Sequence, residues 1–339
     1  MKILNKETVK SRPPKNLEKS DSYLFQHEVE TTFDDVYIKV IKNSVVTKKG
    51  FIFEDYKLFK PFYTTGILYR FLVVLYIDLF KCFFSKKISL KDVLFVTTAH
   101  SKNFFHWHLD VLPKFELIEK FDNPTVALPS YCANGFYRKT LRLYPNIKFI
   151  FIKNCASIHN LNYFPDTAPT GNYRPNLLKL VHNRLVSSLR EYKTKSVDTP
   201  EKIKIYISRG KAKNRKIIHE EIIINQLRSL GFLILHMEDW SYEEQISYTS
   251  RASVLLSLHG AGLTHMLFMP KGSKVIEIRL DGDSLNNCYF SMASGLDHDY
   301  FYILAKKRST RAYMNKSTQK SDFILGENFV KDLEGILDL

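Results

Sequence analysis

The stretch SLHGAGLTHMLFMPKGSKVIEI, residues 257–278, decides the fold, because it reads as a strand, a glycine-bearing turn, a short helix and a second strand. Its first strand starts upstream, and SVLLSLH is almost wholly apolar, which suits a parallel strand covered on both faces. Only 13 glycines occur in 339 residues, yet Gly260 and Gly262 both follow this strand. A turn needs at most one glycine, so the pair indicates that a ligand approaches the backbone. The alternative is a purely structural turn.

Outward from this stretch, apolar strands alternate with helices on both sides of the polar segment KTKSVDTPEK (193–202). This alternation predicts two α/β layers with parallel sheets. A helix is expected to start at Ser241, where Glu244 completes a capping box. We expect strands at 92–98, 125–129, 147–152, 203–208, 232–236, 253–259 and 274–278, and helices at 106–121, 133–144, 180–192 and 217–231.

The composition is strongly basic, with 50 Lys and Arg against 35 Asp and Glu, for a formal charge of +15. Such a balance attracts nucleic acid, an anionic membrane leaflet or a phosphate-bearing substrate. No aromatic–basic RNP motif, helix-turn-helix signature or zinc spacing favours nucleic acid. The four cysteines lack CxxC spacing, which argues against a disulfide framework and fits a reducing compartment. The first twenty residues show no signal peptide.

One stretch, TTGILYRFLVVLYIDLFKCFF (64–84), has the length of a membrane span. Arg70, Asp78 and Lys81 interrupt it, and each charge near a bilayer centre costs about 2.5–3.5 kcal/mol. We therefore expect a buried helix, with an interfacial helix as the alternative. The basic flank FSKKISLK would suit anionic lipid.

The candidate chemistry follows strand ends, where ligands gather in open α/β sheets. Arg209 comes directly after the strand IKIYIS, and Lys211, Lys213, Arg215 and Lys216 follow it. The structural alternative is a solvated basic loop, but the guanidinium of Arg209 could bind a diphosphate through two hydrogen bonds. The chain lacks GxGxxG and GxxxxGK[ST], so an ordinary dinucleotide fold and a P-loop are disfavoured.

Three segments together resemble glycosyltransferase family 61, and the resemblance is tightest over 203–278. They are FHWHLDVLPKFELI, YISRGKAKNRKIIHEE and the long run that ends in HGAGLTHMLFMPKGSKVIEI. The chain has His265 and His219 where the family commonly has Asn, and both differences bear on donor contacts. The resemblance implies a GT-B architecture of two Rossmann-like domains facing a cleft. It also implies inversion at the anomeric carbon and no obligatory metal.

On this resemblance, we divide the chain into an N-terminal acceptor-side domain (1–192), a linker (193–202) and a C-terminal nucleotide-sugar-binding domain (203–310). The tail (311–339) is expected to pack back on the N-terminal domain. Donor binding is assigned to one set of residues: Arg209 and Arg215 for the diphosphate, the amides of Gly260, Ala261 and Gly262 beside them, His259 for diphosphate or sugar, and Glu277 for ribose. The alternative for Glu277 is an ion pair with a nearby cation such as Arg279. His108, Lys213 and His265 are further candidates for donor or acceptor contact.

A base must take the proton of the acceptor hydroxyl, and FHWHLD is where we expect it. Asp110 is the first candidate and His106 the second, since a helix would place them on one face. Pro113 could instead make the segment a loop, and the pair could simply hydrogen-bond within a core. No convincing DxD motif for a metal occurs, and DGD at 281–283 reads as a turn.

The expected function is therefore an inverting, metal-independent glycosyltransferase of the bacterial polysaccharide type. It would use a nucleotide-sugar, most simply UDP-linked, and a glycan acceptor that is acidic, phosphate-containing or lipid-linked. Synthesis of capsule, lipopolysaccharide or another surface glycan is the expected context, in the cytoplasm or peripherally at the inner membrane, without a cofactor. The alternative is a non-catalytic module that binds nucleotide or polysaccharide.

Overall fold

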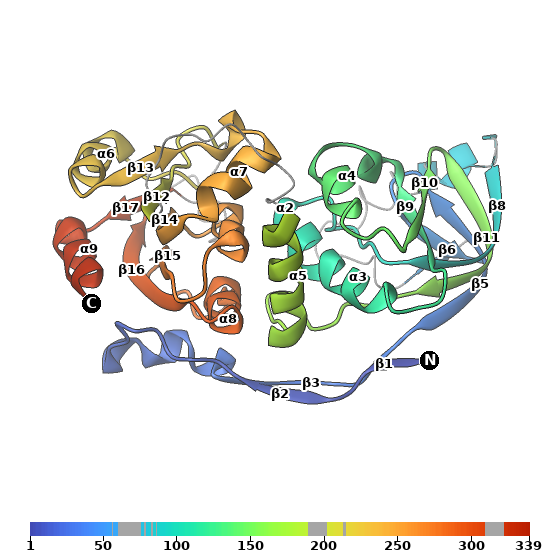
Figure 1. Ribbon diagram of the computed structural model, residues 1–339, viewed down its shortest axis with the longest axis horizontal. Helices are drawn as coiled ribbons and strands as arrows, with labels where there is room; N and C mark the ends of the chain where they lie inside the picture. Colours follow the sequence, from blue (N-terminus) through green and yellow to red (C-terminus); the bar gives the residue numbers. More distant parts are fainter. Residues whose placement is uncertain are drawn as a thin grey trace. The chain divides into compact units, whose positions relative to one another are not determined.

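The computed structural model describes residues 1–55, 57–59, 76–77, 79–82, 84–85, 87–188, 202–212, 215–308 and 322–339. The chain forms two compact units (Figure 1). The first comprises Met1–Glu7 and Phe33–Thr170, and the second Thr8–Thr32 and Gly171–Leu339. Each is described below by itself.

The first unit is built on a seven-stranded sheet of order β10-β9-β8-β11-β5-β6-β7. Strands β10, β9, β8 and β11 run parallel, whereas β5, β6 and β7 continue the sheet in antiparallel pairs. The strands of this sheet are β5 (Lys39–Thr47), β6 (Ile52–Glu54), β7 (Lys57–Leu58), β8 (Lys87–Phe95), β9 (Thr125–Pro129), β10 (Lys148–Ile152) and β11 (Cys155–Tyr163). Strands β1 (Lys2–Leu4) and β4 (Val36–Tyr37) pair in a separate two-stranded sheet. The helices of the first unit are α2 (Phe104–His106), η4 (Trp107–Val111), α3 (Leu112–Ile118), η5 (Ser130–Ala133) and α4 (Gly135–Leu141).

The second unit is built on a six-stranded sheet of order β13-β12-β14-β15-β16-β17, parallel except for β17. Its strands are β12 (Ile203–Ile207), β13 (Phe232–Leu235), β14 (Ala252–Leu258), β15 (Lys274–Leu280), β16 (Asp299–Lys307) and β17 (Phe323–Leu325). Its helices are η1 (Lys19–Leu24), η2 (Gln26–Glu28), α5 (Pro175–Ser188), α6 (Glu220–Ser229), η6 (Met237–Asp239), α7 (Tyr242–Thr249), η7 (Ala261–Phe268), α8 (Cys288–Gly295) and α9 (Phe329–Asp338). A separate two-stranded sheet pairs β2 (Glu7–Lys10) with β3 (Glu30–Phe33).

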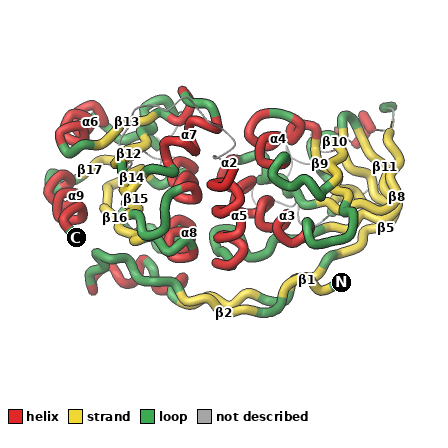
Figure 2. The backbone as a smooth tube through the Cα atoms, viewed as in Figure 1, coloured by secondary structure: helices red, strands yellow, loops and turns green. Residues whose placement is uncertain are grey.

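Helices cover both faces of the second sheet. In Figure 1, α6 and α9 lie on one face and α7 and α8 on the other, and Figure 2 shows the strands as the layer between them. The first face is a continuous core in which apolar side chains of α6 and α9 pack on the strands. The strand order reverses between β12 and β14, because the chain goes from β12 to β13 and then crosses back. Ligands of doubly wound sheets bind at such a reversal, at the carboxyl ends of the strands.

The predicted elements of this unit agree with the structure in type and order. The expected capping box is present, since Ser241 Oγ accepts from Glu244 N at 3.3 Å and Glu244 Oε2 accepts from Ser241 N at 2.8 Å. The compact units, however, differ from the predicted domains. α5 and the segment Thr8–Thr32 lie in the second unit. Helix α9 lies in the second unit and buries Leu333 against the second sheet.

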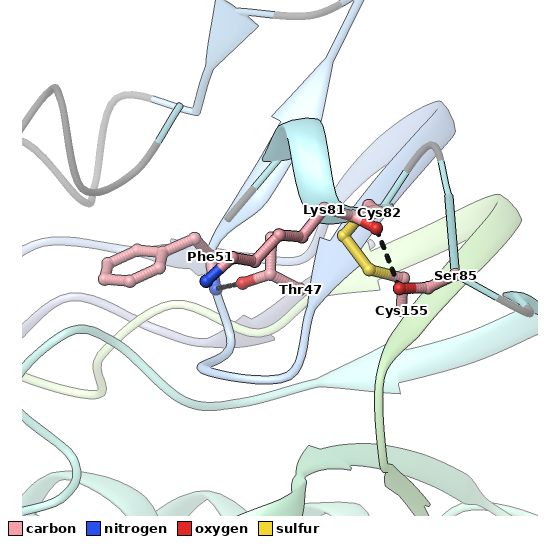
Figure 3. The surroundings of a disulfide bond; sticks show 6 residues. All are labelled: Thr47, Phe51, Lys81, Cys82, Ser85 and Cys155. Carbon is pink, nitrogen blue, oxygen red and sulfur yellow. Dashed lines mark hydrogen bonds between the residues drawn. A yellow bond between two sulfur atoms is a disulfide. The ribbon is translucent and has the colours of Figure 1, made fainter. Parts of the chain in front are cut away.

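The prediction that the cysteines form no disulfide is wrong for one pair. Cys82 and Cys155 are bonded, with their Cα atoms 5.6 Å apart (Figure 3). Cys132 and Cys288 are free. CxxC spacing could not reveal the bonded pair, because the fold brings together residues 73 positions apart. The argument for a reducing compartment loses this support.

The apolar stretch 64–84 lies mostly outside the described residues. Its described end shows Leu79 and Cys82 buried, so this part packs on the first unit. Among the helices that the structure describes, none combines the length and apolar character that a membrane crossing requires.

Candidate functional site

Two strand ends at the reversal of the second sheet bring Arg209 and Gly260 together. A Cβ atom added to Gly260 would lie 2.7 Å from Arg209 Nη1, so the guanidinium lies directly against this glycine. Arg209 Nε donates to the backbone oxygen of Arg215 at 3.0 Å, which fixes the side chain in place. The predicted proximity of the arginine loop and the HGAG bend is therefore present. Its reason is steric, because a Cβ atom at this position would displace the guanidinium from its present place.

The charge at this point is concentrated and partly shielded from water. Burial, and then the like charge of Arg215, lowers the pKa of the Arg209 guanidinium, although it stays protonated near neutral pH. Two neighbouring guanidinium groups at the end of a strand favour a bound anion. Lys213, the third predicted cation, lies outside the described residues.

Gly262 has a structural role in the packing of the turn, and its amide contact to the donor stays a prediction. A Cβ at this position would lie 3.1 Å from Ile207 Cγ2 and 3.3 Å from Ser257 Oγ. The missing side chain therefore lets the turn pack on the ends of β12 and β14. Of the two glycines that drew attention in the sequence, Gly260 stands beside the cations and Gly262 supports the bend.

Beside this bend, His259 is held by a buried carboxylate. Its Nδ1 bonds to Glu277 Oε1, and Glu277 Oε2 accepts from the Tyr300 hydroxyl. Glu277 is fully buried. Burial alone would raise the pKa of Glu277, but His259, Arg279 and Tyr300 outweigh it, so the pKa lies below its usual value. With both oxygens engaged and no surface, Glu277 cannot bind a ribose, and that assignment is corrected.

Two other residues of this unit also differ from the prediction. His265 is buried, with Nδ1 at 2.9 Å from the Gly262 oxygen and Nε2 at 3.0 Å from Gln245 Oε1. Burial lowers the pKa of His265 to about 4. The His265 ring links η7 to α7 by these two hydrogen bonds, so it does not contact the nucleotide-sugar. The DGD segment is a turn, as predicted, because Asp283 Oδ1 accepts from the amides of Leu285 and Asn286.

In the first unit, the two predicted base candidates are in contact. His106 Nδ1 lies 2.8 Å from Asp110 Oδ2, and Asp110 is 8% exposed. Burial is the main cause that raises the pKa of Asp110; the His106 bond opposes it and nearby Asp166 adds to it. A carboxylate with a raised pKa accepts a proton more readily, which is the property that a general base requires.

The local backbone explains how this pair arises despite Pro113. The chain passes from α2 through η4, a π-helical turn, into α3, where Pro113 occupies the first turn. Proline lacks an N–H, and a wider turn before it removes the need for that bond. His108, on the same turn, is fully buried, donates from Nδ1 to the Phe104 oxygen and stacks on Phe136. It is therefore a core residue and not the predicted substrate contact.

Sequence reasoning missed two charged residues next to Asp110. Lys114 is fully buried; its Nζ donates to the Val96 oxygen at 2.7 Å and lies 2.7 Å from Asp166 Oδ1. Lys114 stands one helical turn after Asp110, and this spacing was a usable signal. Asp166 follows β11, a strand that the sequence analysis did not predict. Among the described residues, no group of three or more His, Cys, Asp or Glu side chains could hold a metal ion.

The second unit is thus a Rossmann-like α/β unit with a cationic site at its topological switch point, and the first supplies a buried carboxylate of raised pKa. The family model Glycosyltransferase 61 matches residues 104–276, just over half of the chain. The match includes both regions, and the chain belongs to this family.

Among characterised proteins, the chain is similar to the EGF domain-specific O-linked N-acetylglucosamine transferases of several animals. The Bos taurus and Drosophila melanogaster proteins are each 31% identical over 97 residues, which is 27% of this chain and 18% of the relative. The Xenopus laevis protein is 30% identical over 100 residues, 28% of this chain and 19% of the relative. The chain therefore spans less than a fifth of the length of these relatives.

Proposed function

We propose that the chain is an inverting, metal-independent glycosyltransferase that moves a sugar from a UDP-linked donor to a glycan acceptor. The observation that carries this proposal is the Arg209 guanidinium seated on Gly260 at the switch point of the second sheet. An anionic diphosphate is the ligand that such a site suits. The names of the animal relatives support N-acetylglucosamine as the first sugar to try.

The proposed mechanism uses residues of both units in a GT-B architecture. Arg209 and Arg215 bind the donor diphosphate and stabilise the negative charge that grows as it departs. Backbone amides at the start of η7, from Ala261 onward, add to this stabilisation. Asp110 removes the proton from the acceptor hydroxyl, whose oxygen then attacks the sugar C1 from the face opposite to the diphosphate.

A thermal-shift screen with EDTA tests the donor site. UDP-, GDP- and CMP-sugars are compared, and the UDP-sugars are expected to raise the melting temperature. A donor at a hundredfold excess over Kd adds about 2.7 kcal/mol. For a unit of this size, each kcal/mol shifts the midpoint by about 2–4 °C. No shift with any nucleotide-sugar would exclude the proposal. Binding without transfer or hydrolysis would instead favour the non-catalytic module.

The acceptor is proposed to be a lipid-linked or phosphate-bearing surface glycan, met at an anionic membrane. Exposed apolar side chains gather at the described end of the 64–84 stretch: Tyr76, Ile77, Phe80 and Phe84. Lys48 and Lys81 line a cavity of about 340 Å³ with the two phenylalanines. Each lysine near an anionic surface contributes about 1 kcal/mol. We expect salt-reversible binding to anionic vesicles in a flotation assay; equal partitioning to neutral vesicles would contradict it.

A further inference from the structure

A buried carboxylate below the donor site has no part in the chemistry described so far. Glu277 lies on β15 opposite Ser257 of β14, and it is fully buried. Taking an ionised carboxylate out of water costs several kcal/mol. Burying an apolar residue here would fill the same space without that penalty. The retained charge therefore needs a reason, and its contacts supply one.

The first contact is with His259. An ionised carboxylate only accepts hydrogen bonds, so the proton of this bond belongs to His259 Nδ1. The backbone N–H of His259 donates to the Ile278 oxygen at 2.8 Å, and the imidazole packs edge-to-face with the Tyr289 ring at a centroid distance of 5.1 Å. Position, rotation and tautomer of the imidazole are thereby fixed. No residue that the structure describes forms a hydrogen bond with the other ring nitrogen, Nε2.

The second contact fixes the carboxylate itself. The Tyr300 hydroxyl donates to Glu277 Oε2 and accepts from Arg279 Nη1 at 3.4 Å. Arg279 is buried, lies 4.7 Å from the centroid of the Phe25 ring and donates to the Asp283 oxygen. Glu277 therefore cannot turn away from His259 without breaking its hydrogen bond from the Tyr300 hydroxyl. The positive charge behind Tyr300 keeps the carboxylate ionised.

We propose that Glu277 and Tyr300 are positioning residues, which hold the His259 proton on Nδ1 and keep Nε2 for the phosphates of the nucleotide-sugar. This rests on the proposed function. When both ring nitrogens carry a proton, Nε2–H donates to a phosphate oxygen. The negative charge of Glu277 then stabilises the positive charge of the ring. The bond strengthens as charge accumulates on the departing diphosphate. Glu277 itself touches no substrate.

Kinetics of a double-mutant cycle test the proposal. Glu277→Gln keeps the shape, but its amide can donate as well as accept and no longer dictates the tautomer. Carboxylates behind metal-bound histidines contribute about 10–100-fold, and we expect a loss of this size in kcat/KM. Because Glu277 acts through His259, the variant His259→Ala/Glu277→Gln should be no worse than His259→Ala.

A matched control is available in the same unit, on helix α6. Glu220 is also buried, accepts from the Tyr206 hydroxyl at 2.5 Å and from Ser208 Oγ at 2.9 Å, and does not contact His259. Whatever loss Glu220→Gln causes should add to that of His259→Ala. Wild-type kinetics for Glu277→Gln, or full additivity with His259→Ala, would overturn the proposal.

A measurement on the unaltered chain covers the case in which Glu277→Gln does not fold. In ¹⁵N spectra of the histidine-labelled, ligand-free protein, His259 should carry its proton on Nδ1, and UDP should shift the Nε2 resonance. An unprotonated Nδ1 refutes the positioning role. If Nδ1 is protonated and no nucleotide-sugar binds, the proposed function fails while the hydrogen-bond assignment stands.

Discussion

Replacing Asp110 with asparagine is expected to lower kcat by about 10²–10⁴-fold, the usual contribution of a positioned general base. Asparagine has the same shape, and its amide oxygen can still accept from His106 Nδ1, which lies 2.8 Å from Asp110 Oδ2 in the native chain. The amide cannot take a proton from an acceptor hydroxyl. Because the donor cations Arg209 and Arg215 are unchanged, the Kd for UDP should stay within a few fold.

The matched control for this variant is Asp92→Asn in the same unit. Asp92 is exposed on β8 and accepts from Asn160 Nδ2 at 2.7 Å, so it undergoes the same change of charge away from the candidate base. Its turnover should match that of the wild type. If Asp110→Asn retains turnover in a steady-state assay, the base is another residue, and His106 is then the first to test.

The pH profile adds a second readout of the same assignment. The base works only when ionised. The raised pKa of Asp110 therefore moves the acid limb of the kcat/KM profile to a higher pH than an ordinary carboxylate would give. The bond from His106 lowers this pKa and therefore limits the shift. His106→Ala removes that bond, and the acid limb should move further toward higher pH.

Most of the second unit could be predicted from its sequence, because its strands are short, apolar and separated by well-capped helices. β14 and the helix after Ser241 carry local signals of this kind. β16, the segment Thr8–Thr32 and α9 could not be placed in the same way. The clearest case is Asn16, whose side chain bonds to both backbone groups of Tyr302. A contact between residues this far apart leaves no local pattern.

The candidate site was predictable where a residue directly follows a strand, and not where its role depends on burial. Arg209 and Gly260 both follow predicted strands, and they meet. The position of Glu277 near the end of an apolar strand predicts either a ribose ligand or a partner of a cation, and the structure shows it bonded to His259 inside the unit. Asp166 escaped notice with the unpredicted strand β11. Because β11 was not predicted, the ion pair between Asp166 and the buried Lys114 could not be predicted either.

Removal of the Cys82–Cys155 disulfide is expected to lower the free energy of unfolding of the first unit by about 4 kcal/mol. The bond closes a loop across 73 positions, and in the chain-entropy account this gives about 4 kcal/mol through the unfolded state. The double variant Cys82→Ala/Cys155→Ala should unfold at a lower midpoint in urea than the oxidised wild type. Dithiothreitol should lower the wild-type midpoint and leave that of the variant unchanged.

The bond lies at the amino end of β11, whereas Asp166 follows the carboxyl end of the same strand. Loss of the disulfide should therefore reduce stability without changing kcat per folded molecule. Cys132→Ala is the control, because this buried thiol is free and its variant should stay sensitive to dithiothreitol. A thiol titration under denaturing conditions should find two free thiols in the oxidised chain. Four free thiols, with an unfolding midpoint indifferent to dithiothreitol, would mean that Cys82 and Cys155 stay reduced, and the expected loss of stability would then not occur.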